Sequence, residues 1–106
     1  AVQTGEITVA TRTVEIDGVR CEDGQVIALL DGRLVAAAYS IEEACALLLG
    51  SAKASEHELI TFYYGQDISH AEANRIADLM RGKYREQEIE VQQGGQPHYQ
   101  FIISVE

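Results

Sequence analysis

Hydrophobic and polar residues alternate along much of the chain, and this pattern predicts β-strands. Residues 6–16 (EITVATRTVEI) alternate at both ends, but the apolar positions are odd-numbered at the start and even-numbered at the end. Because a regular strand directs alternate residues to one face, the change of parity predicts a bulge or break at residues 11–13. Aspartate and glycine residues then predict turns at 17–18 and 22–24.

Two apolar runs follow, VIALL at residues 26–30 and LVAAA at residues 34–38. Asp31-Gly32 between them is typical of a two-residue β-hairpin turn. Both runs are apolar at odd and even positions alike, so both faces of these strands are expected to be buried. We therefore predict a hairpin whose strands lie near the centre of a sheet.

Two segments have the periodicity of amphipathic helices, and each begins with the S-x-x-E pattern of a capping box. The first follows Ser40 and ends near Gly50, and the second follows Ser69 and covers residues 70–84. The serine oxygen of such a box accepts a hydrogen bond from the amide three residues later. The predicted apolar stripes are Ile41, Ala44, Cys45, Leu48 and Leu49 in the first helix, and Ala73, Ile76, Ala77, Met80 and Tyr84 in the second.

Three further runs complete the predicted secondary structure. Residues 58–64 (ELITFYY) combine β-branched and aromatic side chains, which is typical of a buried strand. Residues 88–92 and 99–105 alternate as strands with one buried face. The order β-β-β-α-β-α-β-β predicts an α+β fold, close to the α/β class, with a single mixed sheet of about five or six strands and two helices. No linker divides the sequence, so residues 1–106 are expected to form one domain.

Two loops are predicted to meet at one edge of this sheet. Strand 58–64, helix 70–84 and strand 88–92 form a crossover unit, which makes the two strands parallel. Their carboxyl ends therefore share one edge, where YGQD leaves the first strand and QGGQPH leaves the second. Strand 34–38 adds Tyr39-Ser40 to this edge if it runs in the same direction. The predicted rim comprises Tyr39, Tyr64, Gln66, Asp67, Gln93, Gln96, His98 and Tyr99. Open α/β sheets commonly bind ligands at this edge.

Catalytic motifs are scarce in the sequence. No G-x-x-x-x-G-K-[ST] loop is present, and GGQP lacks the spacing and the following helix of a dinucleotide-binding loop. Its simpler interpretation is a glycine turn made rigid by Pro97. The histidines lie on different predicted elements without metal-ligand spacing, so no metal site is expected. His98 beside Tyr99 is the best acid–base candidate, although an exposed histidine without a chemical role is the more ordinary interpretation.

The formal net charge of the 106-residue chain is −9. Acidic residues outnumber basic ones by 8 to 4 in residues 1–54 and by 9 to 4 in residues 55–106, so the charge is spread along the chain. Phosphate backbones and anionic membranes would be repelled, and no nucleic acid partner or membrane span is expected. The acidity is interpreted as charge that keeps the protein soluble or, alternatively, as a docking surface for a basic partner.

The cysteines, Cys21 and Cys45, fit neither a Cys-x-x-Cys pair nor a disulfide scaffold. Cys45 lies among helical apolar residues and is expected in the core, whereas Cys21 lies in a polar turn and is expected to be exposed. A reducing, cytoplasmic environment is therefore expected. Because the chain begins at Ala1 rather than at a methionine, we expect a domain excised from a longer protein.

Two stretches carry a resemblance to a known family. ITFYYGQDISHAEANRIADLM, followed by IEVQQGGQPHYQFIISVE, resembles the C-terminal domain of the bacterial fatty acid kinase A-type subunit family. Residues 6–49 resemble the opening hairpins and first helix of that domain, so that the resemblance covers residues 5–106. Members of the family begin with a DhaL-like kinase domain, which binds ATP and magnesium and is absent from this chain.

The resemblance implies a partner. In this family the kinase subunit phosphorylates a fatty acid that a separate acyl-binding B subunit of the DegV type presents, and the C-terminal domain engages that B subunit. The resemblance implies no catalytic residue and no cofactor in this chain. It suggests a partner-binding rim made by Tyr64, Gln66, Gly94, Gly95, Gln96, Pro97, His98 and Tyr99. Alternatives are a site for a small molecule or an acyl phosphate on the same rim, or a dimerisation domain that gives a homodimer.

Overall fold

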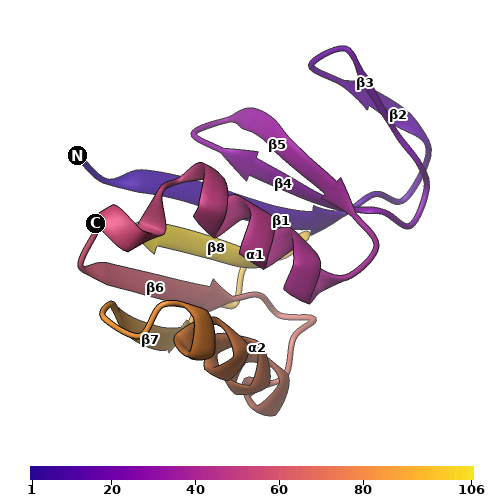
Figure 1. Ribbon diagram of the computed structural model, residues 1–106. Coiled ribbons are helices and arrows are strands. Elements are labelled where there is room, and N and C mark those ends of the chain that lie inside the picture. The colour runs from indigo at the N-terminus through magenta and orange to yellow at the C-terminus, as the bar shows by residue number, and fades with distance from the viewer.

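A computed structural model describes residues 1–106, and its main feature is a mixed six-stranded sheet that carries both α-helices on one face (Figure 1). Across the sheet the strands are β5 (Arg33–Ala38), β4 (Val26–Leu30), β1 (Gln3–Val9), β8 (Tyr99–Val105), β6 (Leu59–Tyr64) and β7 (Glu88–Gln93). The other elements are α1 (Ile41–Ser51), the short 3-10 helix η1 (Ala54–Glu56), α2 (His70–Lys83), and a two-stranded sheet of β2 (Val14–Ile16) and β3 (Val19–Cys21). The predicted α+β class and the predicted order of strands and helices are confirmed.

The last strand of the chain lies in the middle of the sheet. β8 is antiparallel to both of its neighbours, β1 and β6. β6 and β7 are parallel, with α2 as the connection between them, as the crossover unit predicts. Residues that are close in the sheet are therefore often far apart in the sequence, and Gln3 pairs with Val105.

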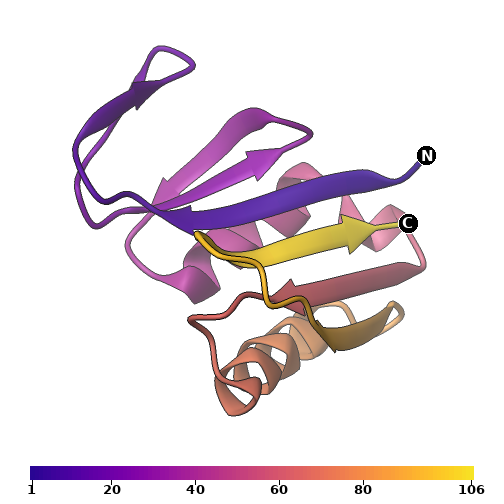
Figure 2. The same cartoon turned by 180° about the vertical axis from the view of Figure 1, so that it is seen from behind.

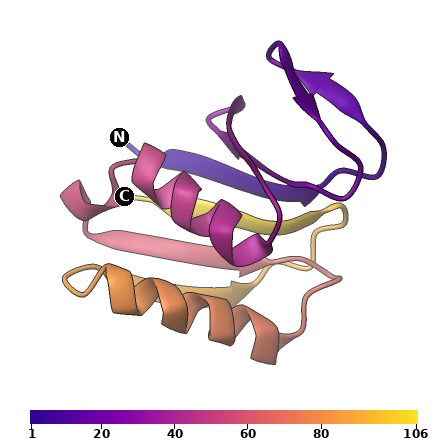
Figure 3. The same cartoon turned by 45° about the vertical axis from the view of Figure 1, so that its right-hand side comes forward.

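The predicted strand over residues 6–16 is interrupted where its parity changes. β1 ends at Val9, and β2 begins only at Val14 in a separate small sheet. β2 pairs with β3, a three-residue strand that the alternation pattern is too short to indicate. This β2–β3 hairpin projects beyond the β4–β5 end of the main sheet (Figure 3).

Two predictions for this region are wrong for one shared reason. β5 is an edge strand and β4 is next to it, so neither lies at the centre of the sheet. Their second face is apolar because the β2–β3 hairpin covers it, and Cys21 packs there with Ile27. Cys21 is accordingly buried rather than exposed.

The main core lies between the sheet and the two helices. Large strand residues such as Ile60, Phe62 and Phe101 are fully buried there, and the two phenylalanine rings meet edge to face with 5.5 Å between their centroids. α1 adds Ala44, Cys45, Leu48 and Leu49, and α2 adds Ala73, Ile76, Ala77 and Met80. Burial raises the pKa of the Cys45 thiol, which makes it a packing residue rather than a nucleophile.

Both helices start as the capping boxes predict. The Ser40 hydroxyl oxygen accepts from the Glu43 amide and the Ser69 hydroxyl oxygen from the Glu72 amide, each at 3.1 Å. Both helices lie on the same side of the sheet, which leaves the opposite face without a helix (Figure 2). No helix has the length and hydropathy that crossing a lipid bilayer requires.

Candidate functional site: the rim of the sheet

Two loops meet at the carboxyl ends of β6 and β7 and bond to each other through their backbones. The amides of Gly94 and Gly95 both donate to the Tyr64 carbonyl oxygen, each at 3.0 Å. The Gln66 amide donates to the Gln96 carbonyl oxygen at 3.0 Å. The structure thus places the YGQD and QGGQPH segments side by side at one edge. We call residues 64–67 and 93–99 together the rim.

Gln96 shapes the rim rather than offering its side chain to solvent. Its side-chain amide donates to the carbonyl oxygen of Tyr63 at 3.0 Å and to that of Tyr99 at 3.2 Å. These two bonds connect the returning loop to the end of β6 and to the start of β8. Gln96 is a positioning residue of the rim, and the exposed Gln66, Pro97 and His98 remain available to a partner.

Gly65 has a role at the rim that the sequence interpretation missed. A Cβ atom at this position would lie 2.2 Å from the Tyr99 carbonyl oxygen and 2.8 Å from the Gln96 carbonyl oxygen. Gly94 is also restricted, because a Cβ there would lie 2.0 Å from Oε1 of Gln96. A glycine directly after a strand is the available signal, since it often marks a close approach of two backbone segments.

His98 occupies an unusual backbone conformation. Its φ is +69°, in the left-handed region that non-glycine residues seldom adopt, and the Thr8 hydroxyl donates to its carbonyl oxygen at 2.7 Å. Its exposed imidazole takes part in no hydrogen bond of the structure. Without a partner to activate or orient it, His98 has none of the geometry of a general acid–base residue.

His70, rather than His98, belongs to a hydrogen-bonded group. Its Nδ1 lies 3.1 Å from the Tyr64 hydroxyl, and its Nε2 lies 2.9 Å from Nδ2 of Asn74. The Tyr64 and His70 rings stand 5.7 Å apart between centroids. This group joins the end of β6 to the first turns of α2, and it contains no carboxylate that would make it a catalytic triad.

Tyr39 is not brought together with the rest of the predicted rim. It follows β5 at the same edge of the sheet, but β4, β1 and β8 separate it from β6. Its side chain is 82% exposed. Gln93, at the end of β7, and Asp67, after β6, lie at the rim itself.

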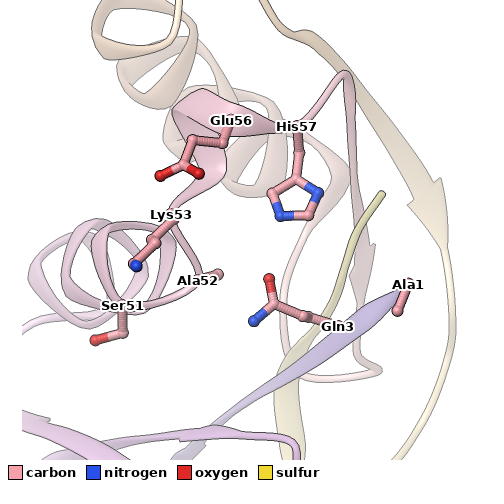
Figure 4. A pocket seen from close by; sticks show the side chains of 7 residues that line it. All are labelled: Ala1, Gln3, Ser51, Ala52, Lys53, Glu56 and His57. Atoms are coloured by element: carbon pink, nitrogen blue, oxygen red, sulfur yellow. The ribbon is translucent and has the colours of Figure 1, made fainter.

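Two hollows lie at opposite edges of the sheet. A pocket of about 270 Å³ at the rim is lined by Thr8, Val9, Thr11, Asp67, His98 and Gln100. A larger hollow of about 470 Å³ lies at the other edge, where Ala1 and Gln3 face Ser51, Ala52, Lys53, Glu56 and His57 (Figure 4). No group of three or more His, Cys, Asp or Glu residues is arranged to hold a metal ion.

The fold and the rim define a class of small α+β domain, with two helices on one sheet face and a pair of bonded loops at one edge. The family of C-terminal domains of fatty acid kinase A-type subunits and their like matches residues 1–106. Similar proteins include YloV of Bacillus subtilis and uncharacterized proteins of Staphylococcus epidermidis and Staphylococcus aureus. Each is 31% identical over 105 residues, which is 99% of this chain and 19% of the relative. The chain belongs to this family of C-terminal fatty acid kinase domains, and it spans about a fifth of the length of these relatives.

Proposed function

We propose that this chain is the non-catalytic docking domain of the kinase subunit of a fatty acid kinase. Its partner would be the acyl-binding B subunit of the DegV type, and another domain of the kinase subunit, with ATP and magnesium, would phosphorylate the presented fatty acid. The family match and the short span relative to the relatives support a domain of a larger kinase subunit. The rim supports the docking role.

The observation that carries the proposal is the way the rim is built. Backbone bonds from Gln66, Gly94 and Gly95, and the side-chain bonds of Gln96, fix two loops against each other. A loop that is already ordered loses less conformational entropy on binding, which favours affinity. The fixed loops present exposed Gln66, Pro97 and His98 outward.

The same rim gives little support to a phosphoryl-transfer or acyl phosphate site. Enzymes of phosphoryl transfer place lysine, arginine or metal ions around the developing negative charge. Residues 64–67 and 93–99 contain no lysine or arginine, and Asp67 adds a negative charge. An anionic ligand would therefore meet repulsion here, whereas a protein surface would not require a local cation.

A calorimetric titration of the full-length kinase subunit with fatty acid-loaded B subunit tests the proposal. His98→Gly removes the exposed imidazole, and it keeps the backbone because glycine adopts φ near +69° without strain. We expect this variant to bind about tenfold more weakly, the loss typical of an interface residue.

Lys53→Gly is the matched control. Lys53 is also exposed with a positive φ of +54°, but it lies at the opposite edge of the sheet. We expect its affinity for the B subunit to equal that of the unmodified protein. Absence of binding by the unmodified protein would reject the docking role, and equal losses in both variants would reject the rim as its place.

A further inference from the structure

The face of the sheet opposite the helices is uncovered over four adjacent strands, β1, β8, β6 and β7 (Figure 2). We call the outward-pointing side chains of these strands the open face. Alternation against the buried core residues assigns to it Thr4, Glu6 and Thr8 of β1, Gln100, Ile102 and Ser104 of β8, Leu59, Thr61 and Tyr63 of β6, and Glu88, Glu90 and Gln92 of β7.

The open face has an apolar centre. Strand register places Ile102 opposite Glu6 on one side and opposite Tyr63 on the other, and Tyr63 opposite Gln92. Tyr63 is 37% exposed, which is unusual for a large side chain in a central strand. An aromatic and an aliphatic side chain surrounded by polar groups form the arrangement of a protein–protein contact surface.

The charge of the open face has one sign. The four strands contain three charged residues, Glu6, Glu88 and Glu90, and all of them point to this face. None of these carboxylates takes part in an ion pair. The helical face differs, because there arginines pair with acids, as Arg75 does with Glu42 and Glu72. A partner that covers the open face must supply positive charge to avoid leaving three carboxylates without compensation.

A pocket at the rim end of the open face points to the same chemistry. Thr8 and Gln100 of the open face line it, together with Asp67 and His98 of the rim. The Thr8 hydroxyl proton is donated to the His98 carbonyl oxygen, so that the hydroxyl can only accept from a ligand. Oε1 of Gln100 is buried and has no hydrogen-bond partner, and the Asp67 carboxylate has no donor either.

These acceptors favour a group that carries several N–H donors and a positive charge. An ammonium or guanidinium group can satisfy Asp67 directly and Gln100 after rotation of its amide. The pocket volume of about 270 Å³ is below the roughly 300–1,000 Å³ typical of small-molecule sites. It suits one long side chain better than a separate ligand.

We propose that the open face of β1, β8, β6 and β7 seats a positively charged surface of the docking partner, and that one lysine or arginine side chain of this partner enters the pocket beside Asp67 and Gln100. This inference rests on the proposed docking function and adds to it the face that is used and the chemistry that it recognises.

Charge reversal on the two faces of the full-length kinase subunit tests the proposal. Glu88→Lys with Glu90→Lys changes the open face, and Glu43→Lys changes an exposed, unpaired residue of α1 on the helical side. Binding of fatty acid-loaded B subunit is measured by calorimetry, and its association rate by stopped flow at several salt concentrations.

We expect the open-face variant to bind at least about tenfold more weakly, with a slower and less salt-dependent association. Glu43→Lys should leave the affinity within about twofold of the unmodified protein. Asp67→Asn should also weaken binding, whereas Thr11→Ala, at the wall of the same pocket, should not. Glu90→Gln removes charge without reversing it, and should give a smaller loss in the same direction if the double variant folds poorly.

The outcomes separate this inference from the proposed function. If the unmodified protein binds and the open-face variants match Glu43→Lys, the docking role stands and the inference is wrong. If the unmodified protein does not bind, the docking role itself fails. Unchanged affinity together with a changed oligomeric state would show that a second copy covers the open face, and this too would overturn the inference.

Discussion

At the scale of single residues, the distinctive residues of the rim determine backbone shape. The conformation of Gly95, at φ +71°, turns the chain after β7, and Gln96 holds the turn to its neighbours. Gly65 allows two carbonyl oxygens to approach its Cα. The chemistry that the sequence suggested for His98 is not developed, because its imidazole has no partner. The rim is thus a shaped surface, and its residues should be tested first for their effect on that shape.

Gly65→Ala should lower the free energy of unfolding of the chain by about 1–3 kcal/mol, the range for forcing extra atoms into a packed site. The added Cβ would collide with the carbonyl oxygens of Tyr99 and Gln96, which are backbone atoms and cannot rotate away. Urea denaturation gives the stability, and hydrogen exchange of the Gly94 and Gly95 amides reports loosening of the rim.

Gly50→Ala provides the control, because Gly50 is an exposed helical residue and its Cβ would meet no atom within 4 Å. Replacing a helical glycine by alanine should raise stability by up to about 1 kcal/mol. A Gly65→Ala protein as stable as the parent would show that the rim backbone can move at little cost.

At the scale of elements, the two helices are connected by charge as well as by the core. Arg75 of α2 bonds to Glu72 in its own helix and to Glu42 at the start of α1. Hydrogen bonds from the Arg75 guanidinium hold the pKa values of the Glu42 and Glu72 carboxyls below their ordinary value of 4.5. The ion pairs favour the folded state only while the carboxyls are charged.

Arg75→Gln should therefore destabilise the chain at neutral pH, and this difference should shrink in acid. Both carboxyls have a lower pKa in the folded than in the unfolded state, so their contribution is fully present above pH 4.5. It is lost as the pH falls through their lowered folded-state pKa values. Urea denaturation of both proteins across this range measures the change.

The matched control for the helix pair is Arg85→Gln, which removes an exposed arginine outside any ion pair. Its effect on stability should be small and should not follow the protonation of Glu42 and Glu72. A stability difference for Arg75→Gln that is the same at neutral pH and in acid would contradict the assigned coupling.

The elements also show which structural information the sequence contains. Helix starts were predictable because Ser40 and Ser69 carry a local chemical signal, and the β6–α2–β7 unit because its handedness is nearly invariant. The places of β4 and β5 were not, since an apolar face gives no indication of what covers it. Here a hairpin of two three-residue strands does so, and it also buries Cys21. The open face could not be predicted either, because it depends on strand order.

At the scale of the whole molecule, the two cysteines should report two different opening events. Cys45 lies in the main core, whereas Cys21 lies in the small cluster under the β2–β3 hairpin. A peripheral hairpin opens at a lower free energy than the core, since fewer apolar contacts are lost. We expect a thiol reagent to modify Cys21 well before Cys45 in the native protein, with both slower than an unfolded control.

Peptide mass spectrometry after timed labelling distinguishes the two sites. The order should disappear in concentrated denaturant, where both thiols react at the rate of an unfolded chain. Modification of Cys45 first, or of Cys21 at the rate of the unfolded control, would contradict the burial of Cys21 that the structure shows.

The place of β8 in the middle of the sheet has a consequence for biosynthesis. β1 must wait for a neighbour that is translated about 100 residues later, because Gln3 pairs with Val105. While the ribosome is still making β6, α2 and β7, the nascent chain can form helices and hairpins, but the two halves of the sheet remain unjoined. Translation of the final strand therefore closes the fold, and a premature stop codon within the last few positions would remove the strand on which both halves depend.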